Sequence, residues 1–397
     1  MTYHRATLVC PIDADPIPDG IVQTDADGRI IAVGPAADFD HGGIPARAGI
    51  LIPGFINTHC HLELSHLRGR VATGTSLLPF LRAVVSLRDT DQDVIDKAIA
   101  HWDDQMWQQG IQSVGDICNK LDTSVVKRDS PIRYYSFVEM FDFLQAETSE
   151  QFVAPYLPVY EQMDAAAGNA RSAVPHAPYT VSPPLFQRIN DLNRGSGTVS
   201  IHNQETPPED QLFLDKTGGF LDFYQGFNFP LTGFTATGRT SIHYALRHMD
   251  PRCRTLFVHN TLTQPADIRA AQEWGRNGVF WATCPNANLY IENRLPNYQN
   301  FLDTDALVTI GTDSLTSNWQ LSVLEELRTI SRFQSYVPLA TLLRWATLNG
   351  ARALGFDDEL GSLTPGKSPG LLLLTDLDGV GEEEQRIGLQ TRVERLV

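Results

Sequence analysis

The sequence contains no apolar run that approaches the roughly 20 residues a helix needs to cross a bilayer. Its first residues, Met1 to Val9, lack the uninterrupted apolar segment of a signal peptide. The five cysteines show no CxxC spacing, which favours reduced thiols over a disulfide framework. These absences predict a cytoplasmic protein with no membrane partner.

Positive charge is also scarce in this chain. Lysine and arginine number 31 against 47 acidic residues, which gives a net charge of −16. Nucleic acids and anionic membranes need a cationic face on their partner, so the charge balance argues against both. Hydrophobic content of 42% is typical of a globular protein, and 397 residues suit either one large α/β barrel or two domains.

The order of strand-like and helix-like segments favours the barrel. The first ~50 residues are strand-like, with a hairpin signal at Asp27-Gly28. Eight candidate strands then follow Pro53-Gly54, most of them separated by helix-length segments: 55–59, 112–117, 132–138, 172–176, 198–202, 255–259, 279–283 and 306–313. This alternation predicts an α/β fold, a (β/α)8 TIM barrel.

Both ends of the chain are expected to lie outside the barrel. Strand character returns at Gly370 to Asp376 and at Thr391 to Val397. We therefore predict a small β-sandwich domain formed by residues 1–52 and 356–397, with the barrel at 53–355. Residues 218–240 form an irregular insertion, which is either a lid over the site or a plain surface loop.

Polar residues end five of the eight predicted strands, and these ends face the active site in such a barrel. His59 and His61 alternate on one strand, so both imidazoles can point to one place. Each of these residues alone could be a hydrogen-bonded histidine or a capping aspartate, but their common position predicts a site. The residues are His59, His61, His176, His202, His259 and Asp313.

The donor types suggest a role for each residue. Three neutral nitrogens and one carboxylate suit a single Zn²⁺, or Fe²⁺ in its place, with a position left for water; we assign them to His59, His61, His202 and Asp313. Such an ion lowers the pKa of its water towards ~7. Glu205, three residues after His202, is the expected general acid/base, although a charge at a helix N-terminus is the alternative. His259 is expected to hydrogen-bond the water or the tetrahedral intermediate.

Several motifs together resemble the amidohydrolase superfamily, and most closely its cytosine-deaminase-like group with the guanine, S-adenosylhomocysteine and aminodeoxyfutalosine deaminases and the triazine hydrolases. They are Pro53-Gly-Phe-Ile-Asn-Thr-His-Cys-His, His176-Ala-Pro-Tyr-Thr-Val-Ser, His202-Asn-Gln-Glu-Thr, Val258-His-Asn, Cys284-Pro-Asn-Ala-Asn and Gly311-Thr-Asp-Ser. The resemblance implies the same metal ligands. It also implies that Glu205, His259 and Asp313 transfer protons and that His176 touches the substrate.

The number of metal ions follows from a missing lysine. Members of the superfamily with two metals bridge them with a carboxylated lysine on the fourth barrel strand, whereas the fourth predicted strand here, Ser172 to His176, has none. One ion per chain is therefore expected. Lys120 and Lys127 lie elsewhere and are interpreted as surface charges. Asn288 departs from the serine that is frequent in relatives, and this could alter substrate contacts.

The metal shell does not identify the substrate. The expected reaction is the hydrolytic deamination of an aminated N-heterocycle, an adenine-type base or nucleoside such as aminodeoxyfutalosine, with release of ammonia. Glu63 is a candidate for substrate binding or else a supporting or surface residue, and Trp319 either stacks on the ring or packs. Three arginines, Arg68, Arg82 and Arg88, could contact a substrate carboxylate, but we interpret each as a solvated helix charge.

Two other functions remain open from the sequence. One is a chlorohydrolase or cyclic-amide hydrolase of the same superfamily. The other is a non-catalytic metal-binding barrel, against which the presence of Glu205, His259 and Asp313 together argues. The expected partner is a small heterocyclic substrate, and the chain is expected to form a homodimer.

Overall fold

A computed structural model describes residues 1–163, 168–379 and 385–397. Eight parallel strands form its centre, in two four-stranded sheets with the orders β5-β6-β7-β8 and β9-β10-β11-β12. Their bounds are β5 Phe55–Cys60, β6 Ile111–Cys118, β7 Arg133–Met140, β8 Ala170–Pro175, β9 Thr198–Asn203, β10 Arg254–His259, β11 Val279–Thr283 and β12 Leu307–Ile310. Each lies at a strand predicted from the sequence.

The two sheets meet at both of their edges through a few backbone contacts. The N–H of His202 at the start of one sheet donates to the carbonyl of His176, just after β8, over 2.9 Å. At the other junction Thr312 and Asp313 donate their N–H groups to the carbonyl of His59, over 2.9 and 3.0 Å. The strands thus surround a common axis, as a TIM barrel requires, and the hydrogen bonds at both junctions lie at the carboxyl ends of the strands.

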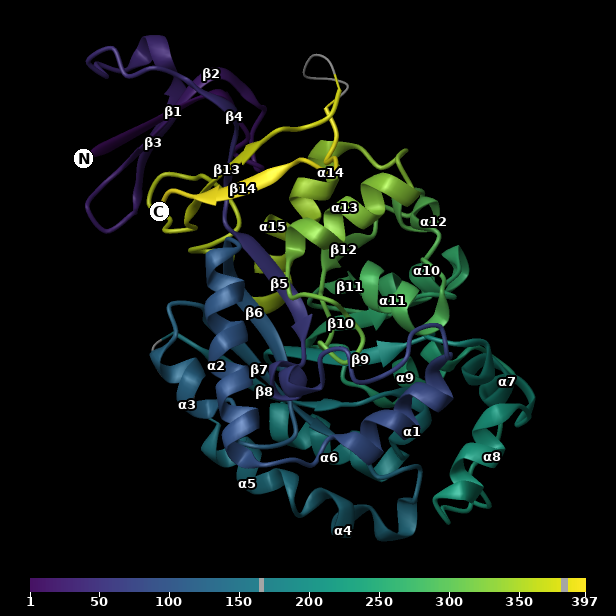
Figure 1. Ribbon diagram of the computed structural model, residues 1–397. Coiled ribbons are helices and arrows are strands. Elements are labelled where there is room, and N and C mark those ends of the chain that lie inside the picture. The colour runs from purple at the N-terminus through teal and green to yellow at the C-terminus, as the bar shows by residue number, and fades with distance from the viewer. Residues whose placement is uncertain (164–167, 380–384) are drawn as a thin grey trace.

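Helices surround the strands (Figure 1). The helices are α1 Leu77–Leu87, α2 Gln92–Gln108, α3 Ser124–Asp129, α4 Ser149–Val153, α5 Tyr156–Gln162, α6 Pro183–Asn193, α7 Pro207–Asp215, α8 Gly219–Gly226, α9 Ser241–His248, α10 Pro265–Trp274, α11 Pro285–Glu292, α12 Tyr298–Leu302, α13 Val323–Phe333, α14 Leu339–Trp345 and α15 Leu348–Leu354. Short 3-10 turns, among them Leu62–Leu67 directly after β5, complete the connections.

Four of these helices begin with proline. The N–H groups of the first turn have no acceptor within the helix, so the missing N–H of proline costs nothing there, and its φ is already helical. These helices are α6, α7, α10 and α11, and the last three follow β9, β10 and β11. In α10 the side chains of Gln264 and Asp267 also form a capping box. These local signals end each βα loop at a fixed residue, which places the loops at the carboxyl ends of the strands.

The predicted insertion at 218–240 is not irregular throughout. Its first part is helix α8, and the residues after it, 227–240, contain no helix or strand. The guanidinium of Arg82 in α1 lies over the rings of Phe223 and Phe227, at 5.4 and 5.9 Å from their centres. The insertion therefore packs against α1, which was not apparent from its glycine-rich and threonine-rich composition.

The two ends of the chain form a separate sheet (Figure 1). Its order is β14-β13-β4-β1-β2-β3, with bounds β1 Thr2–Val9, β2 Ile17–Thr24, β3 Ile30–Pro35, β4 Arg47–Pro53, β13 Leu371–Thr375 and β14 Arg392–Arg395. A small apolar core of its own, which includes Val9, Leu51 and Leu373, lies within it. In the described residues this is one mixed sheet, with β1 and β4 parallel, and not two facing sheets of a sandwich.

None of the described helices is long and apolar enough to cross a membrane.

Candidate active site

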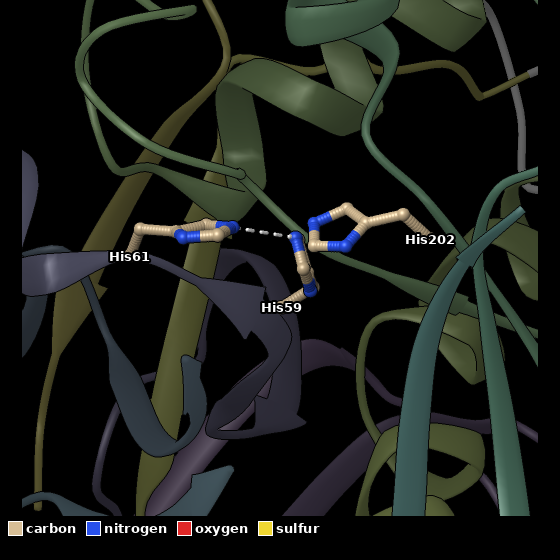
Figure 2. A group of neighbouring side chains, drawn as sticks. All are labelled: His59, His61 and His202. Atoms are coloured by element: carbon tan, nitrogen blue, oxygen red, sulfur yellow. Dashed lines mark hydrogen bonds between the residues drawn. The ribbon is translucent and has the colours of Figure 1, made fainter. Parts of the chain in front are cut away.

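Three histidines from two strands converge at the carboxyl end of the barrel. His59 is the next-to-last residue of β5 and His61 directly follows that strand, and their Nε2 atoms lie 3.2 Å apart. His202 in β9 faces them, with its ring centre 4.9 Å from that of His59 and 5.5 Å from that of His61 (Figure 2). One ring nitrogen from each lies within 4.8 Å of the others, which is close enough for one ion to contact all three.

Asp313 brings a carboxylate to the same place. Its Oδ1 lies 3.3 Å from Nε2 of His61 and 3.6 Å from Nε2 of His59. The residue has a φ of +58°, an uncommon conformation for a non-glycine residue, and the hydroxyl of Ser317 donates to Oδ2 over 2.6 Å. Burial would raise the pKa of Asp313, but the neighbouring His59, His61 and His259 hold that pKa well below its ordinary value.

The histidines of this cluster are neutral. Burial is the largest cause that lowers the pKa of His61 to about 3, and burial also lowers the pKa values of His59 and His202. Nδ1 of His202 donates to the carbonyl of His176 over 2.7 Å, so Nε2 carries the free lone pair. Three neutral imidazoles and one carboxylate fit a divalent metal ion, because a buried anion among unprotonated nitrogens is the donor set that such an ion needs.

Glu205 follows the cluster on a tightly held turn. Gln204 has a φ of +48°, and the N–H groups of Gln204 and Glu205 both donate to the carboxylate of Glu209, over 3.1 and 2.8 Å. The hydroxyl of Tyr179 donates to Oε2 of Glu205 over 2.6 Å. Burial raises the pKa of Glu205 to about 8. A carboxyl group with a pKa near neutrality can both take up and release a proton at physiological pH.

His259 lies opposite Glu205, and the side chain that orients it was not assigned this role from the sequence. Nε2 of His259 is 3.7 Å from Oε1 of Glu205, and its Nδ1 donates to Oδ1 of Asn288 over 2.8 Å. The amide of Asn288 is itself oriented by a bond from Nδ2 to the carbonyl of His259. Asn288 therefore fixes the tautomer that leaves Nε2 of His259 free towards the cluster. The one sequence signal for this role was that Asn288 stands where relatives frequently carry serine.

A cavity of about 160 Å³ opens onto these residues. His61, His176, His202, Glu205, His259 and Asp313 line its polar end. The walls are mainly apolar and come from α1, the residues after β7, the insertion helix α8 and helix α11, with Leu77, Phe80, Leu81, Val84, Val85, Phe141, Phe143, Phe223 and Ile291. This is a concave, largely apolar site with a few convergent polar groups, as small-molecule sites usually are.

Two of the substrate-binding candidates lie outside this lining. Glu63 is buried beside the cavity, where its Oε2 accepts the N–H groups of Asn119 and Lys120. Trp319 is 50% exposed, and its ring packs 5.2 Å from that of Tyr290. His176 does line the cavity, and its Nδ1 contacts the hydroxyl of Thr180 at 2.8 Å. The structure thus groups only His176 with the catalytic and metal-binding candidates.

The interpretations of two basic residues were wrong. Lys127 is not a surface charge: its side chain is buried, and Nζ lies 2.6 Å from the buried Asp116. Arg88 is not a solvated helix charge, because it lines the cavity and pairs with Glu63 at 3.5 Å. Lys120, in contrast, is half exposed as expected. Both errors concern charges that gain a partner from another element of the fold, which composition alone cannot reveal.

Two further polar residues of the cavity were not identified from the sequence. Glu139 lies near the end of β7, and Asn119 follows β6. The signal that found the other site residues, a polar residue at a strand end, also applies to Glu139, which directly follows the predicted strand 132–138. Burial raises the pKa of Glu139 to about 8, against the hydrogen bond from Asn119.

A family model described as the amidohydrolase family matches residues 50–387. The chain belongs to the amidohydrolase family. The matched residues include all eight barrel strands, and therefore the candidate site, together with part of the terminal sheet.

Individual relatives of this amidohydrolase carry deaminase names. It is 27% identical over 390 residues to a 5-methylthioadenosine/S-adenosylhomocysteine deaminase of Moorella thermoacetica, covering 92% of this chain and 83% of the other. It is 26% identical over 344 residues to an aminodeoxyfutalosine deaminase of Nitratiruptor, covering 84% and 81%. A crystal structure of an adenosine deaminase from Xanthomonas campestris with bound zinc superposes with a TM-score of 0.72 at 25% identity, covering 94% and 84%.

Proposed function

We propose that this amidohydrolase hydrolyses the amino group from an adenine-type base or nucleoside, such as aminodeoxyfutalosine, and releases ammonia. The observation that carries the proposal is the buried Glu205, whose carboxylate lies 3.7 Å from His259 beside the histidine and aspartate cluster. Relatives along most of the chain bear the names of adenosine-type deaminases, which supports the same substrate class.

The metal ligands in this proposal are His59, His61, His202 and Asp313, with one Zn²⁺ per chain and Fe²⁺ as the alternative. When bound, such an ion acidifies a water molecule and polarises it for attack. A single ion is proposed because the fourth strand, Ala170–Pro175, contains no lysine to bridge a second. A position left open for water beside the protein donors is what distinguishes catalytic from structural zinc sites.

The reaction joins the oxygen of water to the ring carbon and breaks the bond from that carbon to the amino nitrogen. Glu205 takes a proton from the water and passes it to the adjacent ring nitrogen. Asp313 then takes the remaining proton from the added oxygen and passes it to the amino nitrogen, and as the bond from the ring carbon to that nitrogen breaks, ammonia leaves and the ring carbonyl forms. Nε2 of His259 is directed at the same place by Asn288, so it can hydrogen-bond the oxygen that becomes the ring carbonyl.

The cavity favours a flat apolar ring. Its apolar walls exclude water from the reacting atoms, and His176 lies where it can contact the ring. The polar groups of the site converge on one end of the cavity, so the amino-bearing edge of the ring would enter first.

An ammonia-release screen tests this proposal. Purified protein with metal content measured by elemental analysis would be incubated with purines, nucleosides and pterins. We expect one ion per chain and ammonia release that is greatest with adenine-type compounds. Release of chloride or of a ring-opened product instead would support the chlorohydrolase or cyclic-amide alternative. No turnover of any compound by metal-loaded protein would support a non-catalytic barrel.

Two other expectations stay predictions. A homodimer is expected in solution, which sedimentation velocity can test, and fractionation of source cells can test the cytoplasmic location.

A further inference from the structure

One buried carboxylate oxygen of the cavity lining accepts no hydrogen bond from the part of the chain that the structure describes. Glu139 is 3% exposed and lines the cavity, and its Oε2 accepts a hydrogen bond from Nδ2 of Asn119 over 3.2 Å. Its Oε1 is buried and accepts no hydrogen bond among the described residues. Proteins rarely leave a buried carboxylate oxygen without a donor, because the desolvation is then uncompensated.

The neighbouring groups are already engaged elsewhere. Nδ1 of His202 lies 3.6 Å from Oε1 of Glu139, but its hydrogen is donated to the carbonyl of His176 at 2.7 Å. Arg88, the cation of the cavity lining, is paired with Glu63, which also takes the N–H of Asn119. The hydrogen on Nδ1 of His202 is therefore committed to a carbonyl and Arg88 lies against Glu63, while Oε1 of Glu139 remains for a ligand.

A second metal ion is a poor occupant for this position. Glu139, His176 and His202 do place one possible ligand atom each within 4.8 Å of the others. Nδ1 of His202, however, carries the hydrogen that it donates to a carbonyl, so it has no lone pair for a metal. The hydroxyl of Thr180 donates to the carbonyl of Ala177, so Nδ1 of His176 is the donor in their contact.

The geometry points to an acceptor site for the substrate. We propose that Oε1 of Glu139 accepts a hydrogen bond from an N–H or hydroxyl group on the part of the substrate next to the deaminated ring. The site then selects uncharged heterocycles that carry such a donor over analogues that lack it or that carry a carboxylate or phosphate there. This inference rests on the proposed deaminase function.

The surroundings give this one contact a large influence. Beyond Asn119 and His202, the cavity wall near Glu139 includes the apolar Phe141 and Phe143 from the same strand end. A substrate donor would replace its hydrogen bond to water with one to a buried carboxylate, whereas an analogue without the donor would leave the carboxylate oxygen uncompensated. As a carboxylate, Glu139 offers this oxygen only as an acceptor, because it has no N–H or O–H of its own to donate.

The test compares substrates that differ by a single donor. Suitable pairs are adenosine with 2′-deoxyadenosine and 3′-deoxyadenosine, and adenine with 9-methyladenine. For at least one pair, we expect wild-type protein to prefer the donor-bearing member by ~10-fold or more in kcat/KM. In Glu139→Leu the ratio of kcat/KM between the two members of the pair should fall to near one. The change should arise from KM, while kcat stays within about threefold of the wild-type value.

Glu139→Gln provides a second, conservative variant. Asn119 would still donate to the carbonyl of the new amide, which leaves the NH₂ group in the position of Oε1 and turns an acceptor into a donor. The preference within the pairs should then narrow or reverse, while metal content and melting temperature stay at wild-type values. Glu147→Leu, at an exposed glutamate, is the matched control and should leave every ratio unchanged.

The outcomes separate this inference from the proposed function. Ammonia release with the same ratios in wild type and both Glu139 variants would overturn the role of Glu139 and leave the deaminase function in place. Absence of ammonia release from every compound would overturn the deaminase function, and the substrate contact with it. Loss of metal from both variants, with kcat reduced and KM unchanged, would show that Glu139 supports His202 instead.

Discussion

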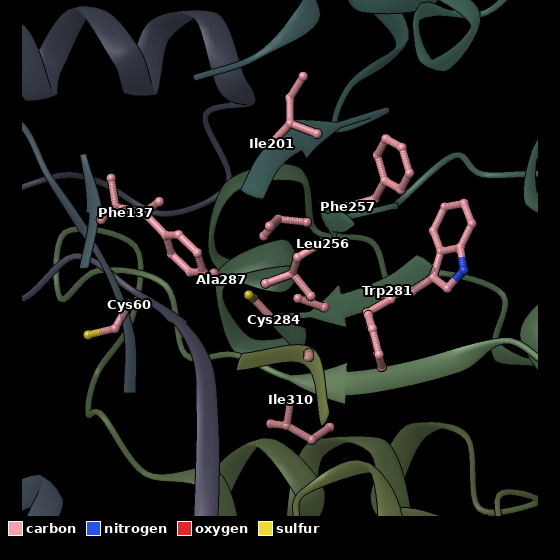
Figure 3. Close-up of a cluster of buried hydrophobic side chains, with 14 of the residues drawn as sticks. Cys60, Phe137, Ile201, Leu256, Phe257, Trp281, Cys284, Ala287 and Ile310 are labelled. Carbon is pink, nitrogen blue, oxygen red and sulfur yellow. The ribbon is translucent and has the colours of Figure 1, made fainter. Parts of the chain in front are cut away.

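The barrel strands carry two kinds of side chain that behave in opposite ways. His59 and His61 enclose Cys60 in the sequence, and Ile201 directly precedes His202; Cys60 and Ile201 belong to the apolar core while the histidines meet in the polar cluster. Figure 3 shows part of that core, with Phe137, Leu256, Phe257, Trp281 and Ile310 among its residues. Adjacent residues of one strand thus lie in different environments, one in the apolar core and one in the polar cluster, because alternate side chains of a strand point to opposite faces.

The two regions differ in what their burial costs. Burial of the core residues is favourable by itself, since it removes apolar surface from water. Burial of the cluster is unfavourable by itself, as the lowered pKa values of its histidines and the raised pKa of Glu205 show. The core therefore stabilises a set of polar groups that a ligand or ion must satisfy, and changes in the two regions should affect different properties.

Loss of the metal should have the largest effect. We expect chelation to abolish ammonia release and added Zn²⁺ to restore it in wild type. His61→Ala should stay inactive at equal zinc, because it removes one of the four donors. The melting temperature should also fall, since an ion that binds only the native state stabilises it. His101→Ala, at an exposed histidine of α2, should behave as wild type. Full activity after removal of all metal would exclude a metal-dependent reaction.

Glu205→Gln should keep the polar cluster and lose the reaction. The amide still accepts from Tyr179 but cannot transfer a proton, so kcat should fall by ~10²-fold or more. Metal content and melting temperature should remain close to the wild-type values. The control is Glu273→Gln, at an exposed glutamate of α10. Ammonia release by Glu205→Gln at nearly the normal rate would remove Glu205 from the mechanism.

A core substitution should show the reverse behaviour. Leu256 is fully buried in β10, and Leu256→Ala should lower the free energy of unfolding by ~2–5 kcal/mol, because it removes buried methyl groups and leaves a cavity. The kcat of the folded fraction should stay within a few-fold of wild type. Leu214→Ala, at a leucine 45% exposed, should change stability little. If Leu256→Ala lost kcat without stability, the separation of the two regions would be wrong.

A smaller effect is expected at the position that orients His259. Asn288→Ala removes the acceptor of Nδ1, so the ring can rotate or change tautomer. We expect a loss of roughly 10-fold in kcat, within the range found for residues that orient site histidines, with metal content unchanged. Asn288→Ser, with a shorter acceptor, should lose less. Equal kinetics in all three proteins would show that the bond to Asn288 does not matter for turnover.

The smallest expected effect concerns pH and stability. In metal-free protein burial raises the pKa of Glu205 from 4.5 to about 8, so between these values the native state holds a proton that the unfolded chain has released. The stability from this group is therefore full below about pH 4.5 and is lost as pH rises towards 8. Glu205→Gln should lessen the decrease in melting temperature between pH 5 and 8 in chelator-treated protein. Parallel curves for the two proteins would contradict the raised pKa.

Most of the barrel could be predicted because its signals are local. Runs of apolar residues marked the strands, and the proline-led helices after them followed ordinary start signals. The terminal segments were correctly predicted to associate, but not as one mixed sheet, since pairing depends on which edges meet. The insertion at 218–240 is not a plain surface loop throughout, because Phe223 of α8 lines the cavity.

The sequence by itself determined that the histidines and Asp313 would gather at the barrel end, because residues at the carboxyl ends of parallel strands reach the same edge wherever each strand lies. Only the tertiary structure decided the partners of the charged groups. Lys127 pairs with Asp116 and Arg88 pairs with Glu63, whereas one oxygen of Glu139 accepts no hydrogen bond among the described residues. Such contacts join different elements of the fold, and a charge is exposed, paired or available to a ligand according to what the fold places against it.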